Sequence, residues 1–282
     1  MARVVLQSAG RTHKLSNALR PVILASACSV LLTTAAPALV QLLPGPQRFV
    51  GNRPERIAAA GVNGDGLLDA AVTHPSTGMV SILFGNGDGS FVARRTIRVA
   101  RDVEGLAVRD LDGDGRVDIA AVTSLDRRLL LLRGRGDGTF ASARRYPVGR
   151  NPVDLAVGSF TRAGATDIAV ANSGNKTVQV FENVNGKAFF RPLGEYALDG
   201  VPQRVIAVDL DNDGLDDLVV LATDPTGGQD DVSVFLNKGD GRLASPTSFI
   251  VAAGGVDVAK ADVNGDGKPD LLVLSAQPIY SV

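Results

Sequence analysis

The sequence predicts an all-β protein made of repeated sheets of four short antiparallel strands. The first observation is a repeat of about fifty residues, in which an Asp followed by small or branched apolar residues recurs at Asp69, Asp118, Asp167, Asp217 and Asp270. The second is a turn rich in Gly, Asp or Asn about twenty residues after each of the first four. No stretch after residue 45 sustains a helical period. Four-stranded sheets at this period are typical of a β-propeller, where radial packing buries both sheet faces.

The third repeat shows how each unit divides into strands. Runs rich in Val and Ile at residues 153–158, 167–171, 177–181 and 189–198 are bounded by Asn, Asp and Gly, which predicts four strands joined by tight turns. The first two runs are almost wholly apolar, as expected for inner strands packed on both faces. The last carries charged residues, as expected for an outer strand.

The number of repeats predicts about five blades. Four units are complete, and a fifth stops at Val282 inside its third strand. Residues 46–50 resemble the end of an outer strand, so they would lend a strand to the last blade and close a five-bladed ring. The alternative is a truncated chain that forms an open arc.

Charge and cysteine content exclude several classes of function. The net charge is −1, and residues 1–38 contain four basic and no acidic residues, so the remainder carries −5. A basic footprint for nucleic acid is therefore absent from the body of the chain. The one cysteine, Cys28, lies in the N-terminal segment. The folded part thus has no disulfide, Cys–zinc site or Cys nucleophile.

The N-terminus predicts export. A basic segment precedes the uncharged run 21–32 and the cleavage pattern Ala36-Pro37-Ala38, which indicates a signal peptide over residues 1–38. A linker at 39–45 and a propeller domain at 46–282 follow. The alternatives are an uncleaved membrane anchor, since the charge-free stretch continues to Leu43, or lipidation at Cys28. In each case the body of the chain is secreted, periplasmic or at the cell surface. We expect the protein to be attached to a membrane only if the N-terminal segment is uncleaved or lipidated.

The loop between the first two strands of each unit contains the candidate metal ligands. In residues 110–118, acids occupy positions 1, 3, 5 and 9 and Gly occupies position 6. Calcium takes six to eight oxygen ligands, which a chain supplies by folding sharply around the ion. The predicted Ca²⁺ ligands, including the position-7 carbonyls, are Asn63, Asp65, Leu67 and Asp69; Asp110, Asp112, Asp114, Arg116 and Asp118; Asp209, Asp211, Asp213, Leu215 and Asp217; and Asp262, Asn264, Asp266, Lys268 and Asp270.

The loops differ in their predicted strength. Fewer charges give weaker binding, so the first loop, where Gly61 replaces the first ligand, is the weakest of the four. The third loop has Ser159, Thr161 and Ala163 before Asp167, and we expect it to bind nothing. An EF-hand is excluded because position 12 is never Glu.

These loops, joined to Asp-Leu/Ile-Ala-Val and to Gly-Asn-Gly-Asp-Gly-x-Phe, resemble the FG-GAP/VCBS repeats of bacterial secreted proteins and of the integrin α-subunit propeller. The resemblance covers residues 46–282 and implies a calcium-stabilised propeller whose opposite face is free to bind ligands. Phe84-Gly85 is retained, but Gly-x-x-Pro replaces Gly-Ala-Pro. The chain is also too short for the seven blades of integrin-like propellers, so no specific ligand or subunit partner is carried over.

The function expected is an adhesion or ligand-binding module for an extracellular protein or glycan, and not an enzyme. His74, the one histidine after the N-terminal segment, reads as a solvated loop residue, so no catalytic triad can be assembled. The paired arginines Arg94-Arg95 and Arg144-Arg145 form either a stripe for acidic glycans or a solvated edge that blocks aggregation. The alternatives are a propeller enzyme or accessory domain acting on extracellular polysaccharide, and a structural cell-envelope protein.

Overall fold

The computed structural model describes residues 3–4, 50, 53–161, 164–239 and 241–276. It contains four antiparallel four-stranded sheets and one three-stranded sheet, which we call blades 1 to 5 in chain order. The only helical turns in these ranges are the short 3-10 segments η1 (Pro75–Thr77) and η2 (Val184–Gly186). The predicted all-β blade architecture is therefore confirmed. The proposed signal segment and linker fall almost entirely outside the described residues.

In blades 1 to 4 the strands follow one another in sequence from the inside of the arc outwards, whereas in blade 5 the N-terminal strand lies outermost. Blade 1 contains β2 (Ile57–Ala60), β3 (Asp69–His74), β4 (Met79–Gly85) and β5 (Phe91–Arg98). Blade 2 contains β6 (Gly105–Arg109), β7 (Asp118–Thr123), β8 (Arg128–Leu132) and β9 (Arg144–Pro147). Blade 3 contains β10 (Pro152–Gly158), β11 (Asp167–Asn172), β12 (Thr177–Asn183) and β13 (Phe190–Ala197). Blade 4 contains β14 (Val201–Val208), β15 (Asp217–Thr223), β16 (Asp230–Phe235) and β17 (Thr247–Val251). Blade 5 contains β18 (Gly255–Ala261), β19 (Asp270–Ser275) and β1 (Arg3–Val4).

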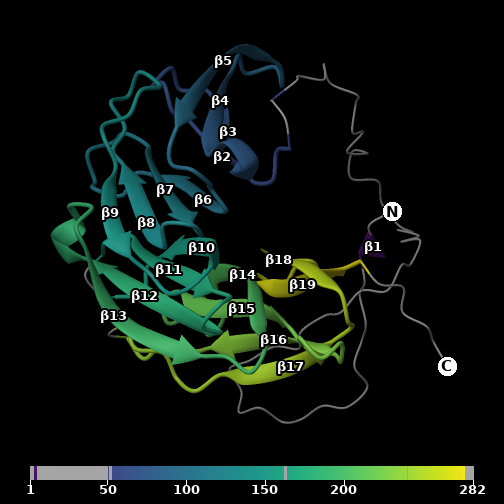
Figure 1. The fold of residues 1–282 in the computed structure, drawn as a ribbon. Helices are drawn as coiled ribbons and strands as arrows, with labels where there is room; N and C mark the ends of the chain where they lie inside the picture. The colour runs from purple at the N-terminus through teal and green to yellow at the C-terminus, as the bar shows by residue number, and fades with distance from the viewer. Residues whose placement is uncertain (1–2, 5–49, 51–52, 162–163, 240, 277–282) are drawn as a thin grey trace.

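The blades form an open arc. The inner strands β2, β6, β10, β14 and β18 lie next to one another in that order, and blade 1 stands apart from blade 5 in Figure 1. Of the segment expected to close the ring, residues 46–49 lie outside the described residues. Val50 packs beside Ala70, Val72 and Leu83 of blade 1, and the strand added to β19 is β1. The open-arc alternative is thus the one the described residues support.

The core lies between neighbouring blades. All six residues of β7 and of β11 are buried, because these strands are covered on both sides. Between blades 2 and 3, for example, Leu129 and Leu131 pack with Ile168, Val170 and Phe181. An apolar run without alternation is the pattern that such double burial requires.

A buried ion pair joins the inner strands near the axis of the arc. The Arg56 guanidinium lies 3.8 Å from the Asp154 carboxylate, which also accepts a 3.1 Å hydrogen bond from the Val205 backbone N–H. Arg56 precedes the first strand of blade 1 and Asp154 lies in blade 3, and the two side chains meet across Gly105 of blade 2. A Cβ atom on Gly105 would lie 3.0 Å from the Asp154 Cα, so this close approach requires glycine.

His74 differs from its expected environment. It is buried, and its Nε2 lies 2.9 Å from the Ser81 hydroxyl oxygen. The prediction of a solvated loop histidine is wrong, because His74 is the last residue of β3 and pairs with Met79 on β4.

Each blade contains one buried carboxylate at the start of its second strand. These residues are Asp69, Asp118, Asp167, Asp217 and Asp270, all at most 3% exposed. In blades 1 to 4, one oxygen accepts backbone N–H bonds from the loop after the first strand, and the other accepts one from the turn between strands 3 and 4. In blade 3, for instance, Asp167 accepts from Phe160, Thr161 and Asn183 at 3.1, 2.8 and 2.8 Å. The carboxylate therefore joins the two loops at one end of the blade.

We predict that Asp167→Ala lowers the free energy of unfolding by about 3 kcal/mol, because it leaves several buried N–H groups without an acceptor. Since the third loop has no other acid, the loss should be the same with and without calcium, as measured by denaturant unfolding. Asp65→Ala, at an exposed position, serves as the control and should change stability by about 0.5 kcal/mol or less in calcium-free buffer. An equally small effect of Asp167→Ala would show that the carboxylate does not hold the blade.

Candidate metal centres

The acidic loops lie between the first and second strands of each blade. Two residues in each of the four predicted sites adopt left-handed backbone angles, at positions 4 and 6; in the second loop these are Gly113 (φ 72°) and Gly115 (φ 82°). In the fourth loop, position 4 is Asn212 (φ 61°), a residue type whose short polar side chain tolerates this region. The reversals fold the chain so that odd-numbered positions can face a common centre.

Two of the predicted sites bring their carboxylates together. In the second loop, one oxygen from each of Asp110, Asp112 and Asp118 lies within 4.8 Å of the others. The fourth loop repeats the arrangement with Asp209, Asp211 and Asp217. These sets occupy positions 1, 3 and 9, and they belong to the two loops whose sequence carries the most acids.

The position-5 acids Asp114 and Asp213 are placed differently. Each accepts a hydrogen bond of 2.9 Å from the backbone N–H of the position-7 residue, Arg116 or Leu215. Asp65 and Asp266 accept the corresponding bonds from Leu67 and Lys268 at 2.8 and 3.0 Å. These bonds fix the turn in which the position-7 carbonyl sits.

The first loop satisfies its polar groups internally. The Asn63 side-chain amide donates to the Asp65 carboxylate at 2.7 Å, while both N–H groups of residues 62 and 63 reach Asp69. Gly61 offers no side-chain ligand, and a Cβ atom added to Gly61 would lie 3.0 Å from the Leu67 carbonyl oxygen. This arrangement agrees with the low rank that the sequence gives this loop.

The fifth loop keeps its first acid engaged with the backbone. Asp262 accepts hydrogen bonds from Gly265 and Gly267, both at 2.8 Å, and Asn264 accepts one from Asp266 at 3.0 Å. Asp270 is buried and accepts from Val263 at 3.0 Å. The described residues bring no group of three acids together here as they do in loops two and four.

The fourth loop fits a cation. The Asp209 Oδ1 atom is buried and has no hydrogen-bond partner, and an unpaired buried carboxylate oxygen is costly unless a cation or donor satisfies it. Burial raises the pKa of Asp217 from its ordinary value of 3.8 to about 6, and the negative charges of Asp211 and Asp209 add to this rise. A divalent ion at this point would remove both penalties.

The second loop contains a residue that the sequence interpretation missed. Arg133, the residue before Gly134, forms an ion pair with Asp112 and lies 3.7 Å from Asp114. The guanidinium brings positive charge to the carboxylates that would bind a metal. The equivalent residue in blade 4, before Asn237, is Leu236. Aligning these turns in the sequence would have revealed the difference.

The third loop lacks a carboxylate cluster among its described residues. The Thr161 hydroxyl and the backbone N–H groups of residues 160 and 161 donate to Asp167, whose pKa is raised by burial. Ala163 lies outside the described residues. The expectation that this loop binds no metal stays a prediction.

Comparison with known proteins agrees with the repeat pattern. The structure is similar to BBS1N in its crystal structure with ARL6DN, soaked with lead: the TM-score is 0.52, the identity is 15%, and the match covers 77% of this chain and 59% of that one. The chain thus spans less than two thirds of that neighbour, and the likeness shows the fold alone. A holotoxin pore of Photorhabdus luminescens also matches, with a TM-score of 0.40 and 19% identity over 82% of this chain and 12% of the other.

No curated protein sequence matches the chain. A family model described as FG-GAP-like repeat matches residues 61–121, 110–163, 159–220 and 209–273. These four matches cover most of the chain and all four predicted calcium loops. Together with the blades and the loop geometry, they show that the chain belongs to the FG-GAP-like repeat family.

Proposed function

We propose that this chain is an exported, calcium-stabilised β-propeller that acts as a ligand-binding or adhesion module and not as an enzyme. The observation that carries the proposal is the convergence of three carboxylates in each of two equivalent loops. Export is supported by the basic and apolar N-terminal segment, which lies largely outside the described residues. Among the described residues, no helix is both long and apolar enough to cross a bilayer.

Calcium suits these loops better than other biological metals. The ligands available are carboxylate and carbonyl oxygens, with no His or Cys nearby in either loop, which favours a hard cation over zinc or copper. Asp110, Asp112 and Asp118 would hold one ion and Asp209, Asp211 and Asp217 a second. Three converging carboxylates with nearby backbone carbonyls suit Ca²⁺, which takes six to eight oxygen ligands, better than Mg²⁺, which keeps several waters and is usually bound by one or two carboxylates.

The role of calcium in this proposal is structural. The position-9 carboxylates bind backbone N–H groups at the blade end, so an ion held by them would brace the same end. The clustered acids of the two loops would be occupied by metal and backbone, which leaves them unsuited to general acid–base work. Ligand binding then falls to the opposite face of the arc.

Calcium removal should lower the melting temperature. Each site occupied at one hundred times its dissociation constant adds about 2.7 kcal/mol to stability, and for a chain of this size each kcal/mol shifts the melting temperature by about 2–4 °C. Calorimetry in millimolar calcium and in excess chelator measures the difference. Asp211→Ala should reduce the calcium-dependent difference in melting temperature more than Asp65→Ala does. Identical melting curves in the two buffers would exclude structural calcium.

Replacement of Arg133 should strengthen calcium binding at the second loop. Arg133→Leu copies the residue of blade 4 and removes a competing positive charge, so we expect affinity to rise about tenfold. Calcium titration in an Asp211→Ala background, where the fourth loop is disabled, isolates this site. The control is Arg135→Leu, since Arg135 donates to the Phe140 carbonyl at 2.8 Å. Unchanged or weaker binding in Arg133→Leu would contradict a competing role.

The calcium-free protein should lose stability as the pH rises from about 4 to about 7. The pKa of Asp217 is raised to about 6 and the pKa values of Asp118, Asp154 and Asp167 are also raised, each chiefly by burial. A group with a raised folded-state pKa contributes stability below its unfolded pKa and loses it as the pH rises through the folded pKa. For Asp217 the loss is about 3 kcal/mol.

Denaturant unfolding at several pH values measures this loss. Saturating calcium should shrink or reverse it, because the ion binds the ionised carboxylates. Stability that rises with pH in chelator would contradict the assignment.

A further inference from the structure

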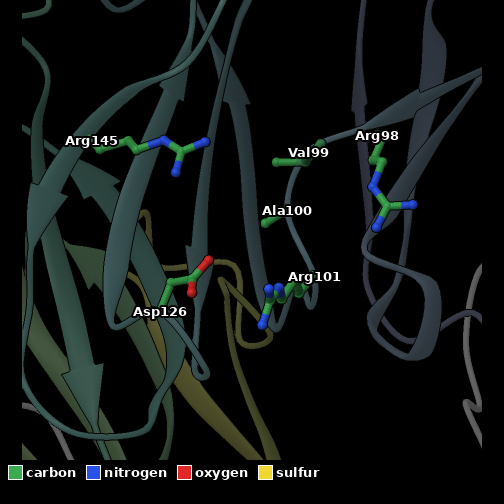
Figure 2. Close-up of a pocket in the computed structure, with 6 residues that line it drawn as sticks. All are labelled: Arg98, Val99, Ala100, Arg101, Asp126 and Arg145. Atoms are coloured by element: carbon green, nitrogen blue, oxygen red, sulfur yellow. The ribbon is translucent and has the colours of Figure 1, made fainter.

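A pocket of about 370 Å³ opens at the junction of blades 1 and 2, on the face opposite the acidic loops. It lies between the segment that connects β5 to β6 and the turn that connects β7 to β8. Arg98, Val99, Ala100, Arg101, Asp126 and Arg145 line it. In Figure 2, Arg145 and Asp126 extend from one side of the Val99–Ala100 segment and Arg98 lies on the other.

Strand alternation directs Arg145 towards this junction. Its neighbours Arg144 and Tyr146 reach the Ala188 carbonyl oxygen in blade 3, at 3.5 and 3.4 Å, so they occupy the other face of β9. Arg145 pairs with Leu130 on β8, and Leu130 packs in the core between blades 1 and 2. Cross-strand partners share a face, which places Arg145 on the side of blade 1.

Three guanidinium groups line this pocket. Among the described residues, no hydrogen bond or ion pair engages the side chains of Arg98, Arg101 or Arg145, and all three are exposed. Arg191 on β13, by contrast, is paired with Glu182. With three guanidinium groups and one carboxylate, Asp126, the lining has a net positive charge, which attracts an anion.

The equivalent junction between blades 3 and 4 has the opposite charge. There the pocket of about 270 Å³ is lined by Asp199, Gly200, Asp224, Pro225, Gln229 and Asp231. As at the junction of blades 1 and 2, the lining comes from the segment that connects the two blades, here β13 to β14, and from the turn between the second and third strands, here β15 and β16. The basic pocket is therefore a property of one junction, and the acidic one repels any long polyanion lying across this face.

We propose that the pocket between blades 1 and 2 binds a carboxylated sugar unit of an acidic glycan. The planar guanidinium fork matches a carboxylate with two parallel hydrogen bonds. Asp126 adds an acceptor for sugar hydroxyls, and the volume falls within the range of small-molecule sites. The acidic junction disfavours any polyanion long enough to reach it, nucleic acid or glycan, so we expect a short acidic segment. This inference rests on the ligand-binding part of the proposed function.

The test compares a short oligogalacturonate with its methyl ester, which keeps the hydroxyls and removes the charge. Isothermal titration of the full chain in calcium should detect the acid and not the ester. Arg98→Gln and Arg145→Gln should each weaken binding about tenfold, and higher salt should weaken it further. Asp199→Asn, at the acidic junction, is the matched control and should not weaken binding.

Three results would overturn the proposal: no binding of the acid, equal binding of acid and ester, or stronger binding of an acidic peptide, single-stranded DNA or anionic vesicles. Calcium stabilisation and uronate binding are tested separately. The melting temperature of Arg145→Gln with and without calcium tests the first, and the titration tests the second. Uronate binding without calcium stabilisation would contradict only the calcium proposal. Calcium stabilisation without uronate binding would contradict only this inference.

Discussion

The buried carboxylate at the start of the second strand is the interaction on which each blade depends. Its two oxygens hold backbone N–H groups from two different loops, so one side chain fixes one end of the sheet. Burial of a charge without such donors would cost several kcal/mol. The bonds offset part of that cost, because burial still raises the pKa of Asp118, Asp167 and Asp217. Because the same residue is position 9 of the acidic loop, it also fixes where the carboxylates of positions 1 and 3 can converge. Blade 3 keeps Asp167 in a loop with no other acid, which separates the structural role from metal binding.

The buried carboxylate acts both in the blade and in the acidic loop. This explains why two loops with the same acids can differ as metal sites. The second and fourth loops carry the same four acids, yet only the second has a guanidinium among them. Arg133 comes from the turn that Asp118 anchors, so the residue that builds the blade end also brings the competing charge to the carboxylates. Leu236 in blade 4 brings no charge to the equivalent acids, and the Asp209 Oδ1 atom of that loop is buried without a hydrogen-bond partner.

The repeats made most of the fold and of the candidate site predictable. The Asp-and-apolar pattern located all five second strands, because a strand packed on both faces needs an unbroken apolar run. Spacing predicted four metal loops, and the number of acids gave the highest rank to the two loops whose carboxylates converge. Two features depend on contacts between segments distant in sequence and were not predicted: Arg133 beside Asp112, and the burial of His74. The open arc was one of two alternatives that the number of repeats left open. His74 precedes Pro75 in a stretch that reads as a polar turn, and only the pairing of β3 with β4 places it inside.

The two faces of the arc obey different constraints, and this difference bears on function. At the acidic-loop face, the geometry of each blade is tied to its own buried carboxylate, so a change there alters stability. At the opposite face, carboxylates also hold the connections and turns, but they differ from blade to blade. Asp102 accepts from the Ser124 and Leu125 backbone N–H groups beside blade 2, and Asp230 accepts from those of Asp224 and Gly255 beside blade 4. Arg101 and Asp126 at one junction and Asp199 and Asp224 at another show this difference. A repeat architecture of this kind keeps the scaffold uniform while each junction at the face opposite the acidic loops acquires its own charge.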